Sequence, residues 1–221
     1  MNRLLKILTV LCWITWLCVS NVGARQGDVP FTQTEITPEV LQRIKGVSYP
    51  ENCSVPIEQL RYLTIQHYNL DGEVCSGELI CHRDISNELL EIFRQLFEAK
   101  YPIERIVLVD EYGGDDEASM ADNNSSAFNY RYVAGTKRLS KHSRGLAIDI
   151  NPKYNPYVRK RGEKTVVSPK GSEKYADRSK DFPCKIDKND LCYKLFKAHG
   201  FTWGGDWKNS KDYQHFEKSL P

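Results

Sequence analysis

The chain has 221 residues, of which 31 are Lys or Arg, 29 are Asp or Glu, and 40% are hydrophobic. This length and composition suit one globular domain with a real core. The nearly balanced charge argues against a strongly basic protein that binds nucleic acid through its phosphates.

Residues 1–24 predict a secretory signal peptide, because Arg3 and Lys6 precede an apolar run over 7–19 and small residues occupy 22–24. The apolar run is shorter than the roughly 20 residues that a membrane span needs, although an uncleaved anchor stays an alternative. Cleavage would leave 29 basic and 29 acidic residues and no stable membrane span. The expected destination is the periplasm or the extracellular medium.

The first half of the chain predicts a hairpin followed by a helix. Residues 25–50 are polar and rich in proline, and we expect a loose lead-in. Residues 60–82 contain two strand-like runs around a turn. Apolar residues recur at helical spacing over 86–100, with Ser86 as the expected N-cap and Pro102 beyond the end.

The second half predicts short strands, loops and one more helix. We expect buried strands within 103–112 and 145–150 and a basic loop over 153–180, which holds nine Lys or Arg against three Asp or Glu. A helix over 190–199 and a final strand pair, 201–207 with 213–218, complete the pattern. This mixed order predicts an α+β fold with a mainly antiparallel central sheet flanked by helices.

Five cysteines remain after the signal segment, and an exported chain can form disulfides. Cys75 with Cys81 and Cys184 with Cys192 are the closest pairs and the expected bridges, which leaves Cys53 over. Other pairings stay open. The absence of a Cys-x-x-Cys spacing argues against a cysteine zinc finger.

His142 and Asp149 bracket a turn and an apolar strand, and Gly145 between them permits a tight turn. A carboxylate in an apolar run needs a partner, because burying a bare charge is strongly unfavourable. A divalent metal supplies that partner, and a salt bridge to Arg144 or Arg131 is the alternative.

His215 adds a second imidazole near the end of the chain. Together His142, Asp149 and His215 make a set of three protein ligands, which is typical of a catalytic zinc ion with its fourth position open. A structural zinc site would fill all four positions. We therefore expect one Zn²⁺ at this site.

Two sequence strings carry a resemblance to a known family. They are Ser140-x-His142-x-x-Gly145-x-Ala147-x-Asp149, and Trp203-Gly204-Gly205 followed by Asp212-x-x-His215-Phe216-Glu217. The pair resembles the zinc D-alanyl-D-alanine carboxypeptidases of the VanY type, which are similar in fold to the Hedgehog N-terminal domain. The resemblance covers about residues 86–221, and the lead-in and hairpin region, 25–85, matches no family that we can name.

The resemblance implies a zinc metallopeptidase that hydrolyses amide bonds in peptidoglycan stem peptides. The two histidines and Asp149 would be its zinc ligands, and Asp212 would be its general base. Asp206 and Glu217 are rival candidates for the base. Carboxypeptidase and endopeptidase activities both stay open, and we expect a monomer.

Several polar residues are candidates for the surrounding cleft. Arg131 is the expected cation for the oxyanion and for substrate, with an ordinary surface arginine as the alternative. Ser140 is expected to bond a metal ligand. Ser119, Asn124 and Ser126 are expected to bind substrate, although a plain polar loop would look the same.

Two other functions are compatible with the same metal ligands. One is a secreted, zinc-stabilised cell-wall-binding module without catalysis, and the other is a metal-dependent nuclease. Asp212 favours catalysis, since a non-catalytic module has no need of an acid three residues before a ligand. The neutral charge argues against the nuclease.

Overall fold

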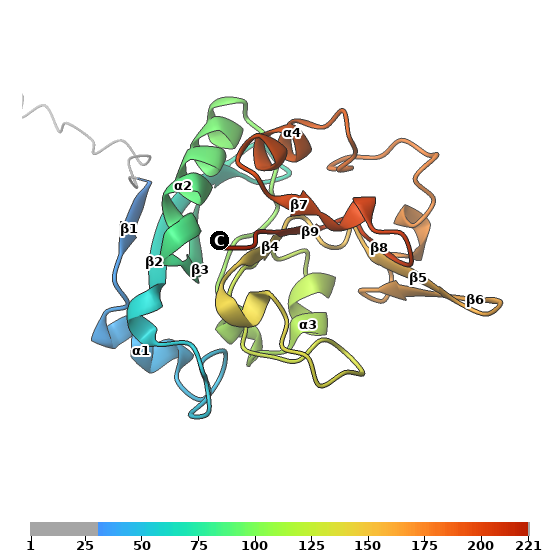
Figure 1. Ribbon diagram of the computed structural model, residues 1–221. Coiled ribbons are helices and arrows are strands. Elements are labelled where there is room, and N and C mark those ends of the chain that lie inside the picture. Colours follow the sequence, from blue (N-terminus) through green and yellow to red (C-terminus); the bar gives the residue numbers. More distant parts are fainter. Residues whose placement is uncertain (1–30, 221) are drawn as a thin grey trace, which may run out of the picture.

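A computed structural model describes residues 31–220, so the expected signal peptide lies outside the described residues. This part of the chain is an α+β fold with four α-helices and three small antiparallel sheets of three strands each (Figure 1). The expected single central sheet is therefore corrected to three sheets. No helix within 31–220 has the length and apolar character to cross a bilayer.

The first sheet contains the expected hairpin. Strand β2 (Leu60–Tyr68) pairs with β3 (Val74–His82) over nine residue pairs, and β1 (Thr32–Thr34) adds to the free edge of β2. Helix α1 (Pro38–Ile44) follows β1. The described part of the lead-in is thus regular, where a loose segment was expected.

Helix α2 (Arg83–Glu98) confirms the clearest expected helix but begins three residues early. Its N-cap is His82, whose Nδ1 accepts from the backbone N–H of Asp84, so the expected cap at Ser86 is wrong. The Ser86 hydroxyl lies in the first turn and donates to the Arg83 carbonyl at 2.8 Å.

One apolar core joins the hairpin to the rest of the chain. Leu79 of β3, Phe93 of α2, Ile148 and Phe216 are all buried in the same cluster. The expected boundary between residues 85 and 86 therefore lies inside one packed unit. Helix α4 (Leu191–Ala198), which confirms the expected second helix, covers this core with Asp190 as its N-cap.

The second sheet carries the C-terminal strands in the order β4 (Ala147–Asp149), β9 (His215–Glu217) and β7 (Thr202–Trp203). These strands confirm the expected positions but are shorter than expected. A segment around Ser126 lies between the first two sheets. Ser126 forms a bridge with Asp149, and the Phe128 N–H donates to the carbonyl of Ile80 in β3 at 3.0 Å.

The expected strand within 103–112 is absent from the structure. This segment is irregular and ends in a 3₁₀ turn, Val109–Tyr112. The Asn124 side chain explains why, since its amide bonds both the N–H and the carbonyl of Val107. A buried backbone can thus be satisfied without a strand partner.

The third sheet corrects the expected basic loop. Strands β5 (Tyr157–Arg161) and β6 (Lys164–Ser168) form a hairpin, and β8 (Lys211–Asp212) pairs with the root of β5. Its signal was the Gly162 turn between two alternating valine-containing runs. Helix α3 (Asp116–Ala121) is a further helix, beyond the two that the sequence predicts.

All five cysteines of the described residues are free. Cys75 and Cys81 lie six residues apart on strand β3, so their Cα atoms are roughly 20 Å apart, far beyond disulfide reach. That expected bridge is wrong. The expected bridge between Cys184 and Cys192 is not formed either.

Candidate metal centre

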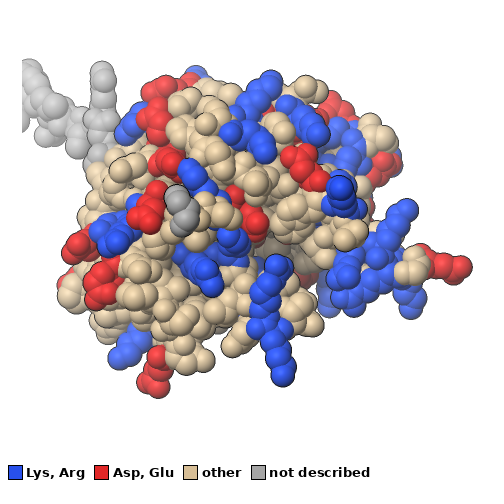
Figure 2. All heavy atoms as spheres, viewed as in Figure 1, with Lys and Arg blue, Asp and Glu red and all other residues tan. Residues whose placement is uncertain are grey.

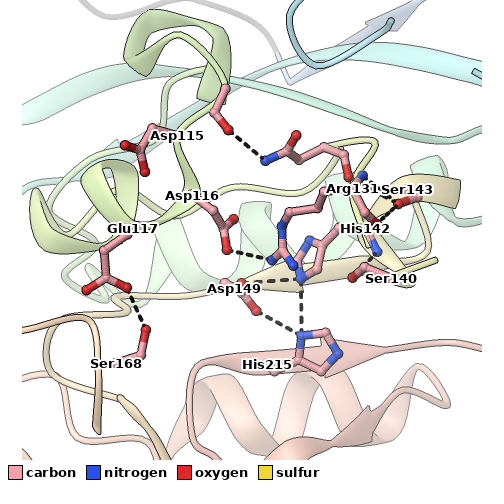
Figure 3. Close-up of polar contacts among 12 residues, drawn as sticks. Asp115, Asp116, Glu117, Arg131, Ser140, His142, Ser143, Asp149, Ser168 and His215 are labelled. Carbon is pink, nitrogen blue, oxygen red and sulfur yellow. Dashed lines mark hydrogen bonds and ion pairs between the residues drawn. The ribbon is translucent and has the colours of Figure 1, made fainter. Parts of the chain in front are cut away.

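His142, Asp149 and His215 converge, although 73 residues separate the first from the last (Figure 3). One ligand atom from each lies within 4.8 Å of the others, and all three residues are buried. Asp149 Oδ1 is 2.9 Å from Nδ1 of His215, and its Oδ2 is 3.2 Å from Nε2 of His142. Asp149 therefore pairs with the two histidines rather than with Arg144 or Arg131.

Strand pairing fixes two of these ligands. Asp149 of β4 stands directly opposite His215 of β9, and such partners project from the same face of a sheet. The next residues, Ile148 and Phe216, point to the other face and are fully buried in the core. Alternation along two short strands thus places the apolar side chains in the core and the ligands in the site.

His142 comes from a 3₁₀ turn, His142–Arg144, that packs tightly against strand β3. Gly145 ends this turn with φ of 64°, and its carbonyl accepts from the His82 N–H at 2.8 Å. A Cβ at Gly145 would lie 2.6 Å from that nitrogen. The expected tight turn at Gly145 is confirmed, and it brings the backbone close to β3.

The outer nitrogens of both rings are held, so the inner ones face the centre of the cluster. His142 Nδ1 donates to the Ala127 carbonyl at 2.6 Å, and His215 Nε2 donates to Glu217 at 3.1 Å. These bonds direct Nε2 of His142 and Nδ1 of His215 towards the cluster, as the two nitrogens that would bind a metal. Sequence reasoning did not find the Ala127 carbonyl, which has no side-chain signal.

The donor set fits a zinc ion. Tetrahedral zinc with bonds of about 2.0–2.1 Å to nitrogen and oxygen places its ligand atoms roughly 3.3 Å apart. The two ring nitrogens are 3.2 Å apart, and Asp149 contacts His215 through Oδ1 at 2.9 Å and His142 through Oδ2 at 3.2 Å, so each carboxylate oxygen faces one ring nitrogen. A small relaxation would admit the ion, with a fourth position left for water or substrate.

The cluster has a strong internal electrostatic field. Burial raises the pKa of Asp149, but His142 and His215 together hold it well below its usual range. Burial lowers the pKa of His215, but hydrogen bonds to Asp149 and Glu217 raise it to about 10. Without metal, an ionised carboxylate and an imidazolium therefore satisfy one another in the buried site.

Asp212 lies beside this cluster, on strand β8. Burial raises the pKa of its carboxyl to about 6, while the nearby His215 lowers it and Asp149 adds to the increase. Its buried Oδ1 has no hydrogen-bond partner in the structure, so this oxygen is free to accept a proton. Gly204 makes room, because a Cβ there would lie 2.7 Å from the Asp212 Cβ.

The rival bases have other contacts. Asp206 is exposed and pairs with Lys188 at 3.4 Å. Glu217 bonds the outer nitrogen of His215, which suits a positioning residue. Trp207, whose ring centre is 5.4 Å from that of His215, adds an aromatic wall to the site.

Arg131 is tied to the turn that carries His142. Its backbone N–H donates to the Ser143 hydroxyl at 2.9 Å, and its carbonyl accepts from the Ser140 N–H at 3.0 Å. Its guanidinium pairs with Asp116 at 2.7 Å, while its buried Nε has no partner (Figure 3). Ser140 Oγ accepts from the His142 backbone N–H at 3.2 Å, so it holds the ligand's backbone and not its ring.

The three expected substrate-binding residues differ in placement. Ser126 forms a bridge with Asp149 and so projects from the same face, next to the cluster. Ser119 and Asn124 are fully buried and bond one another at 3.0 Å. Their expected contact with substrate is corrected to a structural role, the support of the segment that leads to Ser126.

The comparison with protein families agrees with this geometry. Residues 134–218 match the family described as D-alanyl-D-alanine carboxypeptidase, and the matched segment contains all three candidate ligands. This match confirms the resemblance drawn from the two sequence strings. No solved structure matches the chain significantly, so the similarity to the Hedgehog fold stays a prediction.

Proposed function

We propose that this chain, matched over residues 134–218 by the D-alanyl-D-alanine carboxypeptidase family, is a zinc-dependent peptidase acting on peptidoglycan stem peptides. The observation that carries the proposal is the buried cluster of His142, Asp149 and His215 with Asp212 beside it. Three ligands with an open position, next to a free carboxylate, are the parts that metal-assisted amide hydrolysis requires.

Each residue has a role in the proposed hydrolysis. A bound zinc ion would supply a Lewis acid that polarises the scissile carbonyl. Asp212 takes the proton of the attacking water through its free Oδ1 and passes it to the leaving amine. Arg131 supplies positive charge for the developing oxyanion, which requires its guanidinium to turn away from Asp116.

The proposal includes export and leaves the exact bond to experiment. The pattern of residues 1–24 supports export to the periplasm or the medium, where peptidoglycan lies. The family match supports a catalytic role over a non-catalytic wall-binding module or a nuclease. Both removal of a terminal D-alanine and cleavage inside the stem fit the site.

Digestion of purified peptidoglycan tests the proposal directly. The chain without residues 1–24 is incubated with peptidoglycan, with and without a chelator, and the released fragments are identified by mass. We expect metal-dependent release, with free D-alanine alone marking a carboxypeptidase and longer fragments an endopeptidase. No release with any of several divalent metals would refute the proposed activity.

A further inference from the structure

The hairpin of β5 and β6 is a cationic arm. It projects from the body of the molecule, and Lys and Arg side chains gather over it (Figures 1 and 2). Arg159, Lys160, Arg161 and Lys164 are exposed, and Glu163 at the turn is its one acid. Within residues 31–220, none of these four cations forms an ion pair with a carboxylate.

Strand pairing connects this arm to the site. Asp212 of β8 stands opposite Tyr157, the first residue of β5, so the two side chains share one face of the sheet. Alternate residues follow on that face, which places Arg159 and Arg161 in a row with Tyr157. Lys160 projects from the opposite face of the same strand.

The second strand extends the row. Lys164 stands opposite Arg161 and therefore lies on the same face. Like charges directly opposite one another destabilise a hairpin, so this pair has a cost that a bound anion would offset. We name Arg159, Arg161 and Lys164 the cationic row.

The root of the arm is held in place from outside the sheet. The Glu117 carboxylate of α3 accepts from the Ser168 hydroxyl at 2.8 Å (Figure 3). It also accepts from the Lys170 N–H at 2.7 Å. With β8 on one side and α3 on the other, the arm has a defined direction relative to Asp212. The cationic row can therefore act as a fixed extension of the site.

We infer that the cationic row binds carboxylates of the substrate peptide. These carboxylates belong to the part of the peptide that extends beyond the scissile bond. Arg159 lies roughly 7 Å and Arg161 roughly 13 Å along β5 from Tyr157, at about 3.3 Å per residue. An extended peptide presents alternate groups at the same spacing of about 7 Å. This inference rests on the proposed peptidase function and makes the enzyme selective for acidic stem peptides.

The test uses two labelled stem peptides that end in D-alanyl-D-alanine and differ only in whether their interior carboxylates are free or amidated. Binding is measured by fluorescence anisotropy on the zinc-loaded Asp212→Asn chain, and hydrolysis on the chain with Asp212 intact. The variants are Arg159→Gln with Arg161→Gln, the same pair changed to Lys, and Lys160→Gln. Lys160→Gln is the matched control, because it removes charge from the same strand but from the opposite face.

We expect tighter binding and a higher kcat/KM for the acidic peptide. The double Gln variant should reduce this preference by about 2- to 5-fold for each arginine, since exposed ion pairs are individually weak. The Lys pair should retain it, Lys160→Gln should leave it unchanged, and 1 M salt should remove it.

Three results would overturn the inference: no preference for the acidic peptide, no loss in the double Gln variant, or an equal loss in Lys160→Gln. The two readouts separate this inference from the proposed function. Hydrolysis without a preference would reject the cationic row alone. A preference in binding that depends on the arginines, without hydrolysis of either peptide, would reject the peptidase and retain the row.

Discussion

Asp149 and His215 stand opposite one another across β4 and β9, with 2.9 Å between the carboxylate Oδ1 and the ring Nδ1. Only three residue pairs hold these strands in register. A slip of one residue would turn Asp149 towards the core and Ile148 towards the site, because side chains alternate along a strand. The positions of these two ligands therefore depend on the register of β4 and β9.

The first prediction separates metal binding from proton transfer. His142→Ala removes a ligand and should abolish both zinc content and turnover. Asp212→Ala leaves all three ligands in place and should keep zinc, while kcat falls by about 10²- to 10⁴-fold, the usual contribution of a general base. Zinc content is measured by elemental analysis and turnover with a stem peptide. Full activity in Asp212→Ala would refute the base assignment.

The second prediction concerns protons released on zinc binding. The hydrogen bonds of His215 to Asp149 and Glu217 raise its pKa to about 10, so the metal-free ring is protonated at neutral pH. Zinc requires the Nδ1 lone pair and must displace that proton. The pKa of Asp149 is already held below its usual range, so its carboxylate contributes none.

We therefore expect release of about one proton from His215 at pH 7–8, and zinc affinity that rises with pH until about 10. Calorimetric titration in buffers of different ionisation enthalpy measures this number. An enthalpy of zinc binding that does not depend on the buffer would show that the metal-free His215 ring is neutral. This result would contradict the proposed pairing of its charge with Asp149.

His142 and Asp149 could be predicted from sequence because their signal is local, and His215 because it belongs to the second sequence string. His142 and Asp149 lie within one turn and strand, and their residue types admit few other roles in an apolar run. The hairpin over 60–82 and the helix α2 were predictable for the same reason, since period and turn residues act over short distances.

Other contacts between distant segments could not be predicted. The Ala127 carbonyl holds His142 through the backbone, which every residue has. The pairing of β5 with β8, which sets Asp212 beside Tyr157, joins residues 55 and 53 positions apart through only two residue pairs. Ser119 and Asn124 looked like cleft residues because polarity alone does not distinguish a buried amide from an exposed one.

The third prediction concerns Gly204, which makes room for the base. A Cβ at Gly204 would lie 2.5 Å from the Asp212 carbonyl oxygen and 2.7 Å from its Cβ. Gly204→Ala should therefore displace the Asp212 carboxylate, and a 1 Å displacement can cost roughly 100-fold in rate. Zinc content should stay close to that of the unchanged chain.

Gly145→Ala is the matched comparison for this effect. Its Cβ would lie 2.6 Å from the His82 nitrogen, and φ of 64° disfavours any side chain. This change should move His142 and weaken zinc binding. If Gly204→Ala instead lost its zinc while Gly145→Ala retained it, the two assignments would be wrong: Gly204 as the residue that makes room for Asp212, and Gly145 as the residue that positions His142.

The fourth prediction distinguishes a positioning role for Glu217 from a role as the base. Glu217 Oε2 accepts from His215 Nε2 at 3.1 Å, on the side of the ring away from the cluster. Loss of such a partner usually lowers metal affinity by about 10- to 100-fold. Glu217→Ala should therefore weaken zinc binding and recover activity at high zinc, whereas Glu217→Gln keeps an acceptor oxygen and should lose less. Unchanged zinc affinity with a loss of kcat that excess zinc does not restore would instead identify Glu217 as the base.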